Sequence, residues 1–566
     1  MEDRGFLDLT CRAVTDTLVS SEPGAEIRRE NEDTVKVIVA DKISERGVEL
    51  LRAQAGWKIV LTTKETLHAE IADADALVVR SATKVTAELL EKAPRLRVVG
   101  RAGVGVDNID LEAATRRGVL VMSTPGGNAI SVAEHTFALL LALARQVPRH
   151  DAAIHAGRWE KSSAAGTEVR GKTLGLIGLG RIGGEVARRA RAFEMRVLAY
   201  DPYISEAAAR EAQVELVPLE KLLAESDFVS LHTALSPATQ NLINAQSIAQ
   251  MKKGARLVNA ARGELVDEGA LAEALKSGRL AGAALDVFVE EPPKNSPLIA
   301  LPNVIATPHV AGSTTEAQEE VGTQIAQQVR DYLADGIIRN AVNLPALSAE
   351  QYRRVLPYLE LAERLGSLVS QAAAVRPARI RIRYSGELAE AGTHLLKSAV
   401  LTGILNAVLD EKVNLVNAAA VAAARGLTVE EETRRREHGF PNTLEVASLP
   451  EPGSKQPGLS VEGTVLHDAS PRVLAIDGIP LESQLAGTIL YLRNHDQPGV
   501  IGQVGTLLGQ QGVNIATFAL GRRDATRGAE AVSLVRLDGD VPESAVEPIR
   551  KLPAVTEAKL VHLGKS

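Results

Sequence analysis

The sequence predicts an α/β protein: two doubly wound parallel-sheet domains, Rossmann-like or flavodoxin-like, followed by an α+β domain and a ferredoxin-like βαββαβ domain. Three observations predict this class. Short β-branched runs alternate with helical patterns from residue 35 onward and again from residue 173, as expected for repeated βαβ units. A glycine-rich turn opens the second alternation. Strands and helices then follow in the order βαββαβ over residues 486–566.

Length, charge and cysteine content bound the functions to be considered. The 566 residues allow three to four domains of about 150 residues each. A net charge of −7 disfavours nucleic acid as a partner, and no apolar run reaches the roughly 18 residues of a membrane span, so we expect neither partner. Cys11 is the only cysteine, which excludes an internal disulfide and a Cys-based metal site. We therefore expect no metal and a reducing, cytoplasmic location.

The individual elements follow from the hydrophobic periodicity. Strands are expected at 35–40, 57–62, 76–80 and 96–100 in the first unit, and at 173–178, 196–200, 227–231, 255–259, 282–287 and 303–306 in the second. Long helices are expected over 131–147 and, after Thr307, through about Ala334. In the last unit, strands are expected at 488–494, 514–523, 530–537 and 555–563, with a helix from Pro498.

Two parts of the chain are harder to interpret. Residues 1–33 are acidic and lack a continuous apolar stretch, and we expect them to form a mobile extension. Between residues 346 and 485 the pattern predicts one strand at 379–384, Ala-rich helical segments that include 418–424, and a loop at 449–460. We interpret the Arg-rich stretch 434–438 as a solvated helix face rather than an anion site.

A glycine fingerprint predicts a dinucleotide site. Gly178, Gly180 and Gly183 stand in the G-x-G-x-x-G arrangement at the end of an expected strand and the start of a helix. Such glycines permit a tight turn, close approach of backbone amides to a pyrophosphate, and helix-on-strand packing. Asp201 follows at the end of the next strand, where a carboxylate binds ribose hydroxyls and repels a 2′-phosphate. We therefore expect NAD as the cofactor.

Three polar residues near the ends of later strands are candidate catalytic groups. Arg262 could clamp a carboxylate bidentately and polarise a neighbouring carbonyl. His309 could act as the acid or base that hydride transfer to a carbonyl requires. Glu291 could hold that imidazole in one orientation and favour its protonated form. Behind a dinucleotide fingerprint, this set predicts a hydride-transfer site.

The motifs of this chain resemble those of the D-isomer-specific 2-hydroxyacid dehydrogenases, in particular the long members with an intervening domain and an ACT domain. The resemblance runs from Val35 to the C-terminus. It implies reversible NAD-dependent oxidation of 3-phospho-D-glycerate to 3-phosphooxypyruvate, the first step of L-serine biosynthesis. The motifs include VRSATKVT (79–86), GRAGVGVDNIDLEAATRRG (100–118), YDPY (200–203), NAARGELVDEGAL (259–271) and PHVAGST (308–314).

The resemblance also implies roles for single residues. Arg262 would bind substrate, His309 would donate and accept the proton, and Glu291 would be its partner. Two arginines suit a phosphorylated substrate, although each could instead form a structural ion pair. Substrate contacts are implied for Arg80, Arg101 and the amides of Ala102, Gly103 and Val104. Cofactor contacts are implied for Gly178, Gly180, Arg181, Ile182, Gly183, Asp201, Thr233, Ala260, Asp286 and Gly312.

The family fold implies a discontinuous substrate-binding domain and an arrangement of paired subunits. Domain closure about a hinge near His309 would expel water before hydride transfer. The helix near 131–160 is implied to form a dimer interface, and the intervening domain is implied to make tetramer contacts or to bind regulatory anions. The implied domains are substrate-binding at 34–128 and 310–345, NAD-binding at 129–309, intervening at 346–485, and ACT at 486–566.

The C-terminal unit carries the implied effector site. ACT units pair across subunits and bind amino acids, and Asn494, Asp496 and Asn514 match the positions that hold L-serine in serine-regulated relatives. Asn494 stands where several members have His, so serine inhibition stays open. The choice between a homodimer and a homotetramer stays open as well. We interpret His232 as structural.

Two other functions compete with this interpretation. One is a related D-2-hydroxyacid dehydrogenase, such as a hydroxypyruvate or glyoxylate reductase, but those enzymes usually lack the two C-terminal domains. The other is a non-enzymatic, NAD-gated scaffold of the corepressor type. Such scaffolds lack an ACT-like module, and nothing in the sequence resembles a peptide-recruitment segment.

Overall fold

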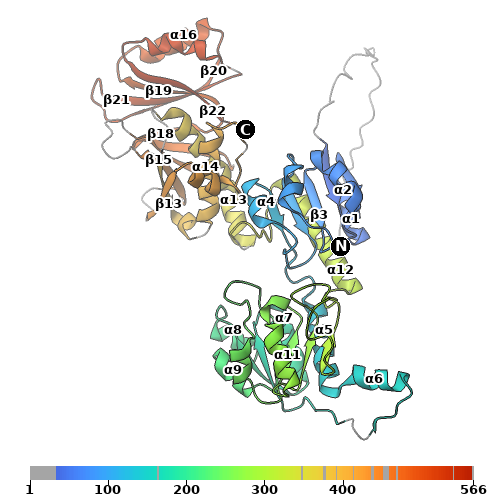
Figure 1. The fold of residues 1–566 in the computed structure, drawn as a ribbon. Helices are drawn as coiled ribbons and strands as arrows, with labels where there is room; N and C mark the ends of the chain where they lie inside the picture. The colour runs from blue at the N-terminus through green and yellow to red at the C-terminus, as the bar shows by residue number, and fades with distance from the viewer. Residues whose placement is uncertain are drawn as a thin grey trace, which may run out of the picture.

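The computed structural model describes residues 34–563 except 162–164, 346–348, 374–377, 391, 412, 435–438, 450–457, 467–468 and 540. The expected extension over 1–33 and most of the Arg-rich stretch 434–438 therefore lie outside the described residues. Four separate sheets organise the rest of the chain (Figure 1). No single described helix has the length and apolarity to cross a membrane; α5 (Ala129–Arg145) and α6 (Val147–His155), which meet at a bend of 66°, are long and apolar enough only when taken together.

The first sheet is five-stranded, parallel and doubly wound, in the order β2-β1-β3-β4-β5. Its strands are β1 (Val35–Val39), β2 (Trp57–Leu61), β3 (Ala76–Val79), β4 (Val98–Arg101) and β5 (Leu120–Met122). The sequence pattern missed β5, because three residues are too short to show a period. The helices of this part are α1 (Glu45–Arg52), α2 (Lys64–Glu70), α3 (Ala87–Glu91) and α4 (Leu111–Arg116).

A distant helix completes this first lobe. Helix α12 (Thr315–Asp335) returns after the second sheet and packs Ile325 and Val329 against β4. A Cβ on Gly100 of β4 would lie 2.8 Å from both side chains, so the strand must present a glycine there. The first lobe is thus assembled from two separate parts of the chain.

The second sheet has seven parallel strands in the order β12-β11-β10-β9-β6-β7-β8. Its direction of growth reverses between β6 and β9, which is the place where open α/β sheets bind ligands. The strands are β6 (Thr173–Ile177), β7 (Arg196–Tyr200), β8 (Glu215–Leu216), β9 (Phe228–Leu231), β10 (Arg256–Asn259), β11 (Gly282–Leu285) and β12 (Val304–Ala306). The helices are α5 (Ala129–Arg145), α6 (Val147–His155), α7 (Arg181–Ala192), α8 (Glu206–Glu211), α9 (Leu219–Glu225), α10 (Ala245–Gln250) and α11 (Glu268–Lys276).

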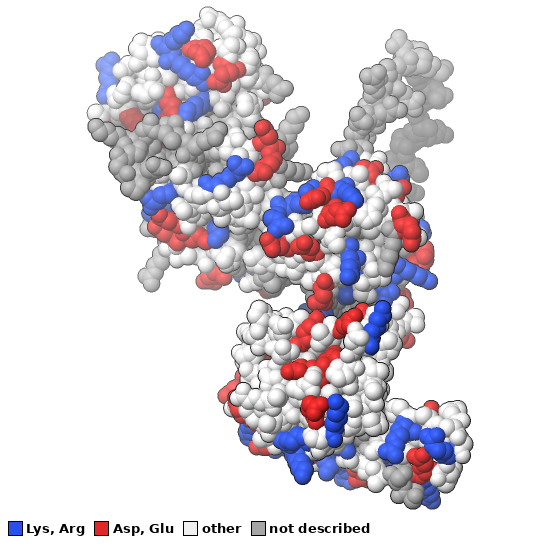
Figure 2. Space-filling model, viewed as in Figure 1, with Lys and Arg blue, Asp and Glu red and all other residues white. Residues whose placement is uncertain are grey.

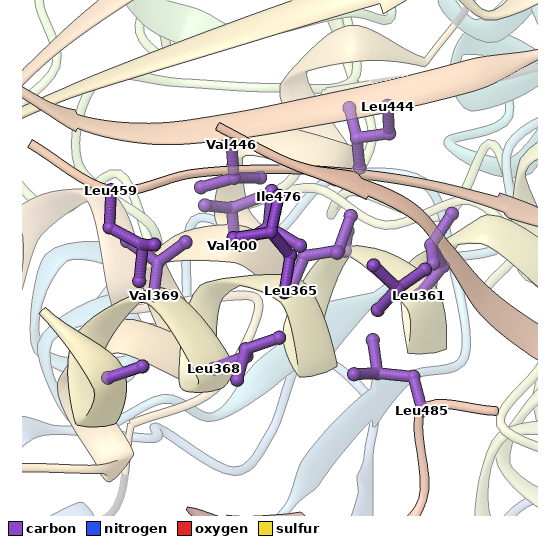
Figure 3. Close-up of a cluster of buried hydrophobic side chains, with 14 of the residues drawn as sticks. Leu361, Leu365, Leu368, Val369, Val400, Leu444, Val446, Leu459, Ile476 and Leu485 are labelled. Carbon is purple, nitrogen blue, oxygen red and sulfur yellow. The ribbon is translucent and has the colours of Figure 1, made fainter. Parts of the chain in front are cut away.

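The third sheet is mixed and six-stranded, and it corrects the expectation of a single strand in this region. Long helices cover it, and Leu361, Leu365 and Val369 of α13 point toward Val446 and Ile476 of the sheet (Figure 3). The elements are α13 (Ala349–Ala372), β13 (Arg379–Ser385), α14 (Thr393–Asn406), α15 (Ala418–Ala424), β14 (Thr428–Arg434), β15 (Thr443–Leu449), β16 (Ser460–Val465), β17 (Pro471–Ile476) and β18 (Ile479–Gln484).

A further expectation in this region was wrong, and one could not be compared in full. Arg434 ends β14 and lies 3.7 Å from Glu445, so the described part of the Arg-rich stretch is strand and not helix. The edge strand β14 misled the pattern because all but one of its seven side chains are exposed and four of them are charged. The expected loop at 449–460 overlaps the ends of β15 and β16, and its centre lies outside the described residues.

The fourth sheet is antiparallel in the order β20-β21-β19-β22, which confirms the ferredoxin-like fold. Ile489 and Val561 of this sheet share a buried core with α13, so the last two domains pack together. Asn414 Nδ2 donates a hydrogen bond to Gly118 O at 2.8 Å, which connects the last two domains to the first lobe. The elements are β19 (Gly487–His495), α16 (Val500–Gln510), β20 (Ile515–Arg522), β21 (Glu530–Leu537), α17 (Glu547–Arg550) and β22 (Val555–Leu563).

The contact between α1 and α12 makes the first lobe sensitive to one methyl group. A Cβ on Gly47 would lie 2.5 Å from the backbone O of Gly322. We expect Gly47→Ala to destabilise the protein by about 1–3 kcal/mol, because overpacking forces the helices apart. Calorimetric unfolding measures the change. As a control, Gly505→Ala on α16 adds a methyl with no atom within 4 Å and should cost nothing, so equal behaviour of the two variants would contradict the prediction.

Candidate active site

The glycine turn between β6 and α7 has the geometry that the fingerprint predicts. Gly178 has φ +97°, and a Cβ there would lie 2.6 Å from His232 O. A Cβ on Gly183 would lie 2.2 Å from Gly178 O, whereas Gly180 faces open space. Helix α7 begins after Gly180 without a side-chain cap, so its first N–H groups and its dipole are available to an anion. This cradle fits the pyrophosphate of a dinucleotide.

Asp201 lies directly beside that turn. Its Oδ2 accepts a hydrogen bond from Leu179 N and its Oδ1 accepts one from Tyr203 N, both at 2.9 Å. These bonds fix the carboxylate at the end of β7 and leave further lone pairs on each oxygen. The position suits the binding of ribose hydroxyls.

The other expected cofactor residues follow neighbouring strand ends. Thr233 comes after β9, Ala260 after β10 and Asp286 after β11. Arg181 packs against Gly126, whose Cβ would lie 3.0 Å from Arg181 Cδ. Ile182 stands next to it in the first turn of α7, and Gly312 lies against Asn128 in the segment that joins the lobes. The fold therefore brings these positions to one edge of the second sheet.

His309 and Glu291 form a close pair. His309 Nδ1 lies 2.8 Å from Glu291 Oε2, and Glu291 Oε1 accepts a hydrogen bond from Phe288 N at 3.2 Å. His309 has φ +54°, a conformation that costs energy for a residue with a Cβ, and its N–H donates to Asp286 O at 2.9 Å. The His309 side chain is 51% exposed, and its Nε2 has no hydrogen-bond partner among the described residues. That nitrogen is therefore open to a ligand.

Asp286 holds the loop that carries His309. Its carboxylate is buried and accepts hydrogen bonds from Thr307 Oγ1 at 2.5 Å, Val310 N at 3.0 Å and Ala311 N at 2.9 Å. His135 Nε2, from α5, lies 3.3 Å from Asp286 Oδ1. Burial alone would raise the pKa of Asp286, but these hydrogen bonds outweigh it and hold the pKa below its usual range. Asp286 is therefore ionised at neutral pH; its expected contact with the nicotinamide carboxamide stays a prediction.

Arg262 reaches from the second lobe to the first. Its Nε and Nη2 lie 3.1 Å and 3.0 Å from Asp107 Oδ2, and its Nη1 donates to Ala261 O at 2.7 Å. Asn259 stiffens the turn, because its Nδ2 donates to Arg262 O at 2.8 Å. A Cβ on Gly105 would lie 1.9 Å from Arg262 Nη2, so the guanidinium rests directly on that glycine.

Two further arginines face the same region from the first lobe. Burial lowers the pKa of Arg101 to about 10, with a smaller contribution from the charge of Arg262, so Arg101 stays protonated at neutral pH. Its buried Nε has no hydrogen-bond partner in the described part of the chain. Arg80 donates from Nη1 to Lys42 O at 3.3 Å. The charge of Arg101 interacts with Asp107 and Asp41, and its buried, unpartnered Nε suits a further contact to an anionic ligand.

The expected amide cradle is smaller in the structure. Ala102 N already donates to Val79 O at 2.8 Å and Gly103 N to Arg101 O at 2.9 Å. The first bond continues the pairing of β3 with β4, and the second forms in a tight turn in which Gly103 has φ +148°. Among the three expected amides, only that of Val104 is left to meet an anion.

The sequence analysis missed four residues that build this site. Asp41 Oδ2 accepts from Arg80 N at 2.6 Å, and Asn108 Nδ2 donates to Arg80 O at 2.7 Å, so both fix the backbone at Arg80. His135 and Asp107 were missed as well. Asn108 and Asp107 lie within the quoted motif at 100–118, but His135 lies in an apolar helix where no motif marks it.

The expected effector residues are not brought together within one chain. Asn494 pairs with Ala531 in the sheet, whereas Asn514 lies beside Asp538, to whose Oδ2 it donates at 2.6 Å. Leu537 pairs with Ile515, the residue after Asn514, and it lies six positions beyond Ala531 along β21, a distance of about 20 Å. Asp496 lies near Asn494 and pairs with Arg522 at 3.3 Å. A site that uses all three residues therefore needs two copies of the chain.

Three family models match the chain in succession. The NAD-binding domain of the D-isomer-specific 2-hydroxyacid dehydrogenases matches residues 137–311, the D-3-phosphoglycerate dehydrogenase intervening domain 354–477, and the ACT domain 488–554. The chain is 43% identical to the D-3-phosphoglycerate dehydrogenase of Methanocaldococcus jannaschii, over 94% of this chain and 100% of that protein. It is 39% identical to that of Bacillus subtilis, over 93% of this chain and 99% of the relative.

A solved structure agrees with the dehydrogenase part. A protein of Thermus thermophilus is 37% identical, with a TM-score of 0.50, and the match covers 54% of this chain and 100% of that protein. The fold and the site together define an NAD-binding oxidoreductase of the D-isomer-specific 2-hydroxyacid dehydrogenase class. Within that class, the chain belongs to the D-3-phosphoglycerate dehydrogenase family, which confirms the resemblance in the sequence, the fold class and NAD as cofactor.

His232 provides a test of the packing behind the glycine turn. It is half-buried, with Nε2 2.8 Å from Ser230 Oγ, and desolvation lowers its pKa from 6.5 to about 4. The unfolded chain therefore takes up a proton near pH 6.5 that the folded chain refuses until about pH 4. We expect stability to fall by about 3 kcal/mol as pH drops through this window.

Thermal unfolding as a function of pH checks this expectation. His232→Gln should remove that part of the pH dependence, because an amide does not titrate in this range. His155→Gln, at a side chain that is 80% exposed, is the matched control and should keep the wild-type profile. An unchanged profile in His232→Gln would show that His232 does not control acid sensitivity.

Proposed function

We propose that this chain catalyses the reversible NAD-dependent oxidation of 3-phospho-D-glycerate to 3-phosphooxypyruvate, the first step of L-serine biosynthesis. The observation that carries the proposal is the His309–Glu291 pair at 2.8 Å, placed at the same sheet edge as the glycine turn and Arg262. The names of the relatives that match nearly the whole chain support the substrate.

The positive side chains of the two lobes suit an anionic substrate with two charged ends. Arg262 would bind the carboxylate and polarise the adjacent C2 oxygen. Arg80, Arg101 and the amide of Val104 would bind the phosphate, and the unpartnered Nε of Arg101 supports this assignment. Lactate and glycolate have no group for the second set of charges.

His309 would move the proton. In oxidation, its Nε2 accepts the proton of the C2 hydroxyl, and in reduction it returns that proton to the carbonyl oxygen. Glu291 would hold the ring through Nδ1 and stabilise the imidazolium that forms. Asp286 keeps the loop in place through four hydrogen-bonding contacts.

The residues around the glycine turn would hold NAD, which supplies the hydride acceptor when it is bound. The N-terminus of α7, with Arg181 and Ile182, would cover the pyrophosphate. Asp201 would bind the adenosine ribose and disfavour a 2′-phosphate. Thr233, Ala260, Asp286 and Gly312 would line the remainder.

We further propose that the protein works in the cytoplasm as a homo-oligomer, a dimer or tetramer, with L-serine as effector. Helix α6 projects away from the second lobe (Figure 1), and Val147, Ile154 and Trp159 in and after it are 54%, 54% and 80% exposed. A second copy of the chain would cover these side chains. Pairing of the ACT sheets would bring Asn514 of one copy to Asn494 and Asp496 of another.

On the face seen in Figure 2, acidic and basic side chains are interspersed.

The proposed substrate is tested by NADH oxidation with 3-phosphooxypyruvate, compared with hydroxypyruvate, glyoxylate, pyruvate and 2-oxoglutarate. We expect a clear preference for the phosphorylated acid, because only that acid engages both groups of arginines. Parallel assays with L-serine test the effector. Preference for an unphosphorylated acid would support a hydroxypyruvate or glyoxylate reductase instead, and no turnover with any acid would favour an NAD-gated scaffold.

Replacement of His309 tests the mechanism. We expect His309→Ala to lower the rate of carbonyl reduction by about 10²- to 10⁴-fold, because general acid catalysis is lost. NADH affinity, followed by fluorescence titration, should stay within twofold to threefold of wild type, roughly 0.5 kcal/mol. His155→Ala serves as the surface control. Wild-type turnover in His309→Ala would refute the assignment.

A further inference from the structure

The Asp107–Arg262 pair joins the two lobes across the site. Asp107 lies in the loop between β4 and α4 of the first lobe, and Arg262 follows β10 of the second. One carboxylate oxygen lies 3.1 Å from Nε and 3.0 Å from Nη2 of the guanidinium. The Asp107 side chain is 65% exposed, whereas that of Arg262 is 29% exposed.

The edge of Arg262 that Asp107 occupies is the one that a ligand carboxylate needs. Nη1 donates to Ala261 O, and the Nε and Nη2 edge faces Asp107. The guanidinium lies against Gly105, where a Cβ would be 1.9 Å from Nη2. A substrate carboxylate that binds this edge of Arg262 bidentately must therefore take the place of the Asp107 carboxylate.

The Asp107 side chain does not shape its own loop. Its neighbour Asn108 donates to Arg80 O and Thr83 O, and Asp110 caps α4 by accepting from Ala113 N at 2.9 Å. Among the described residues, Arg262 is the one hydrogen-bond partner of the Asp107 side chain. Asp107 therefore contributes its negative charge to the contact between the lobes, where it also acts to raise the pKa of Arg101.

We propose that Asp107 is a positioning residue that stands in for the substrate carboxylate: it holds Arg262 extended across the cleft and yields that place when the substrate arrives. This inference rests on the proposed function for the identity of the substrate. The negative charge of Asp107 offsets the positive charge of Arg262 in a region that also contains Arg80 and Arg101. Any anion that binds Arg262 at this edge must therefore break the ion pair first, which weakens its binding. The same pair re-forms when product leaves, which favours release.

Asp107→Asn tests the proposal, because it keeps the shape and removes the charge. We expect KM for 3-phosphooxypyruvate to fall by roughly two- to fivefold, since the substrate no longer displaces an ion pair, while kcat does not rise. Asp107→Glu keeps the charge and should keep the KM near that of wild type. Glu112→Gln on α4, 85% exposed and paired with Arg116, removes the same charge outside the cleft and should leave KM unchanged.

A binding measurement separates this proposal from the proposed function. Calorimetric titration of the NAD-loaded protein with oxalate, a dicarboxylate without phosphate, should show the same gain in affinity in Asp107→Asn. If oxalate binds more tightly to the variant but wild type does not turn over 3-phosphooxypyruvate, the substrate is wrong and the role of Asp107 stands. A KM that is unchanged or raised, together with unchanged oxalate affinity, would overturn it. Asp107→Ser replaces the Asn variant if that variant does not fold.

Discussion

The buried carboxylate of Asp286 is the constraint on which the site depends. It stands at the end of β11 and draws Thr307, Val310, Ala311 and His135 together through hydrogen-bonding contacts. A buried charge is tolerated only when it is well paired, so these partners must stay in place. His309 lies within this loop with φ +54°, and its backbone N–H donates to Asp286 O. The candidate proton donor is therefore positioned by the backbone around Asp286 together with its side-chain contact to Glu291.

The second organising feature is the separation of charge between the lobes. Arg80 and Arg101 belong to the first lobe, whereas Arg262 and His309 belong to the second. Asp41 and Asn108 fix the chain around Arg80, because they form hydrogen bonds with its backbone N–H and C=O groups. The candidate site therefore draws its charged groups from both lobes, and the contact between Arg262 and Asp107 joins them.

The C-terminal half of the chain forms one packed body. The ACT sheet shares its core with α13, and Asn414 connects that body to the turn at Gly118 after α4. Helix α4 follows the loop that carries Asp107. The ACT sheet is therefore connected through packed elements to the loop that carries Asp107.

The sequence alone determined the order of the main elements in the two parallel sheets and in the C-terminal βαββαβ unit, the cofactor and the residues of the glycine turn, because these depend on local periodicity and on glycine spacing. It also indicated Arg262, Glu291 and His309, since polar residues after parallel strands meet at one edge. Local pattern did not show β5, β8 and β14, which are too short or too exposed to carry a period, nor β15–β18 of the third sheet. Only the tertiary structure decided that His135 supports Asp286, that Asp107 faces Arg262, and that Asn494 and Asn514 lie at opposite ends of a sheet. Those contacts join residues that are far apart in the chain, and sequence spacing holds no information about such distances.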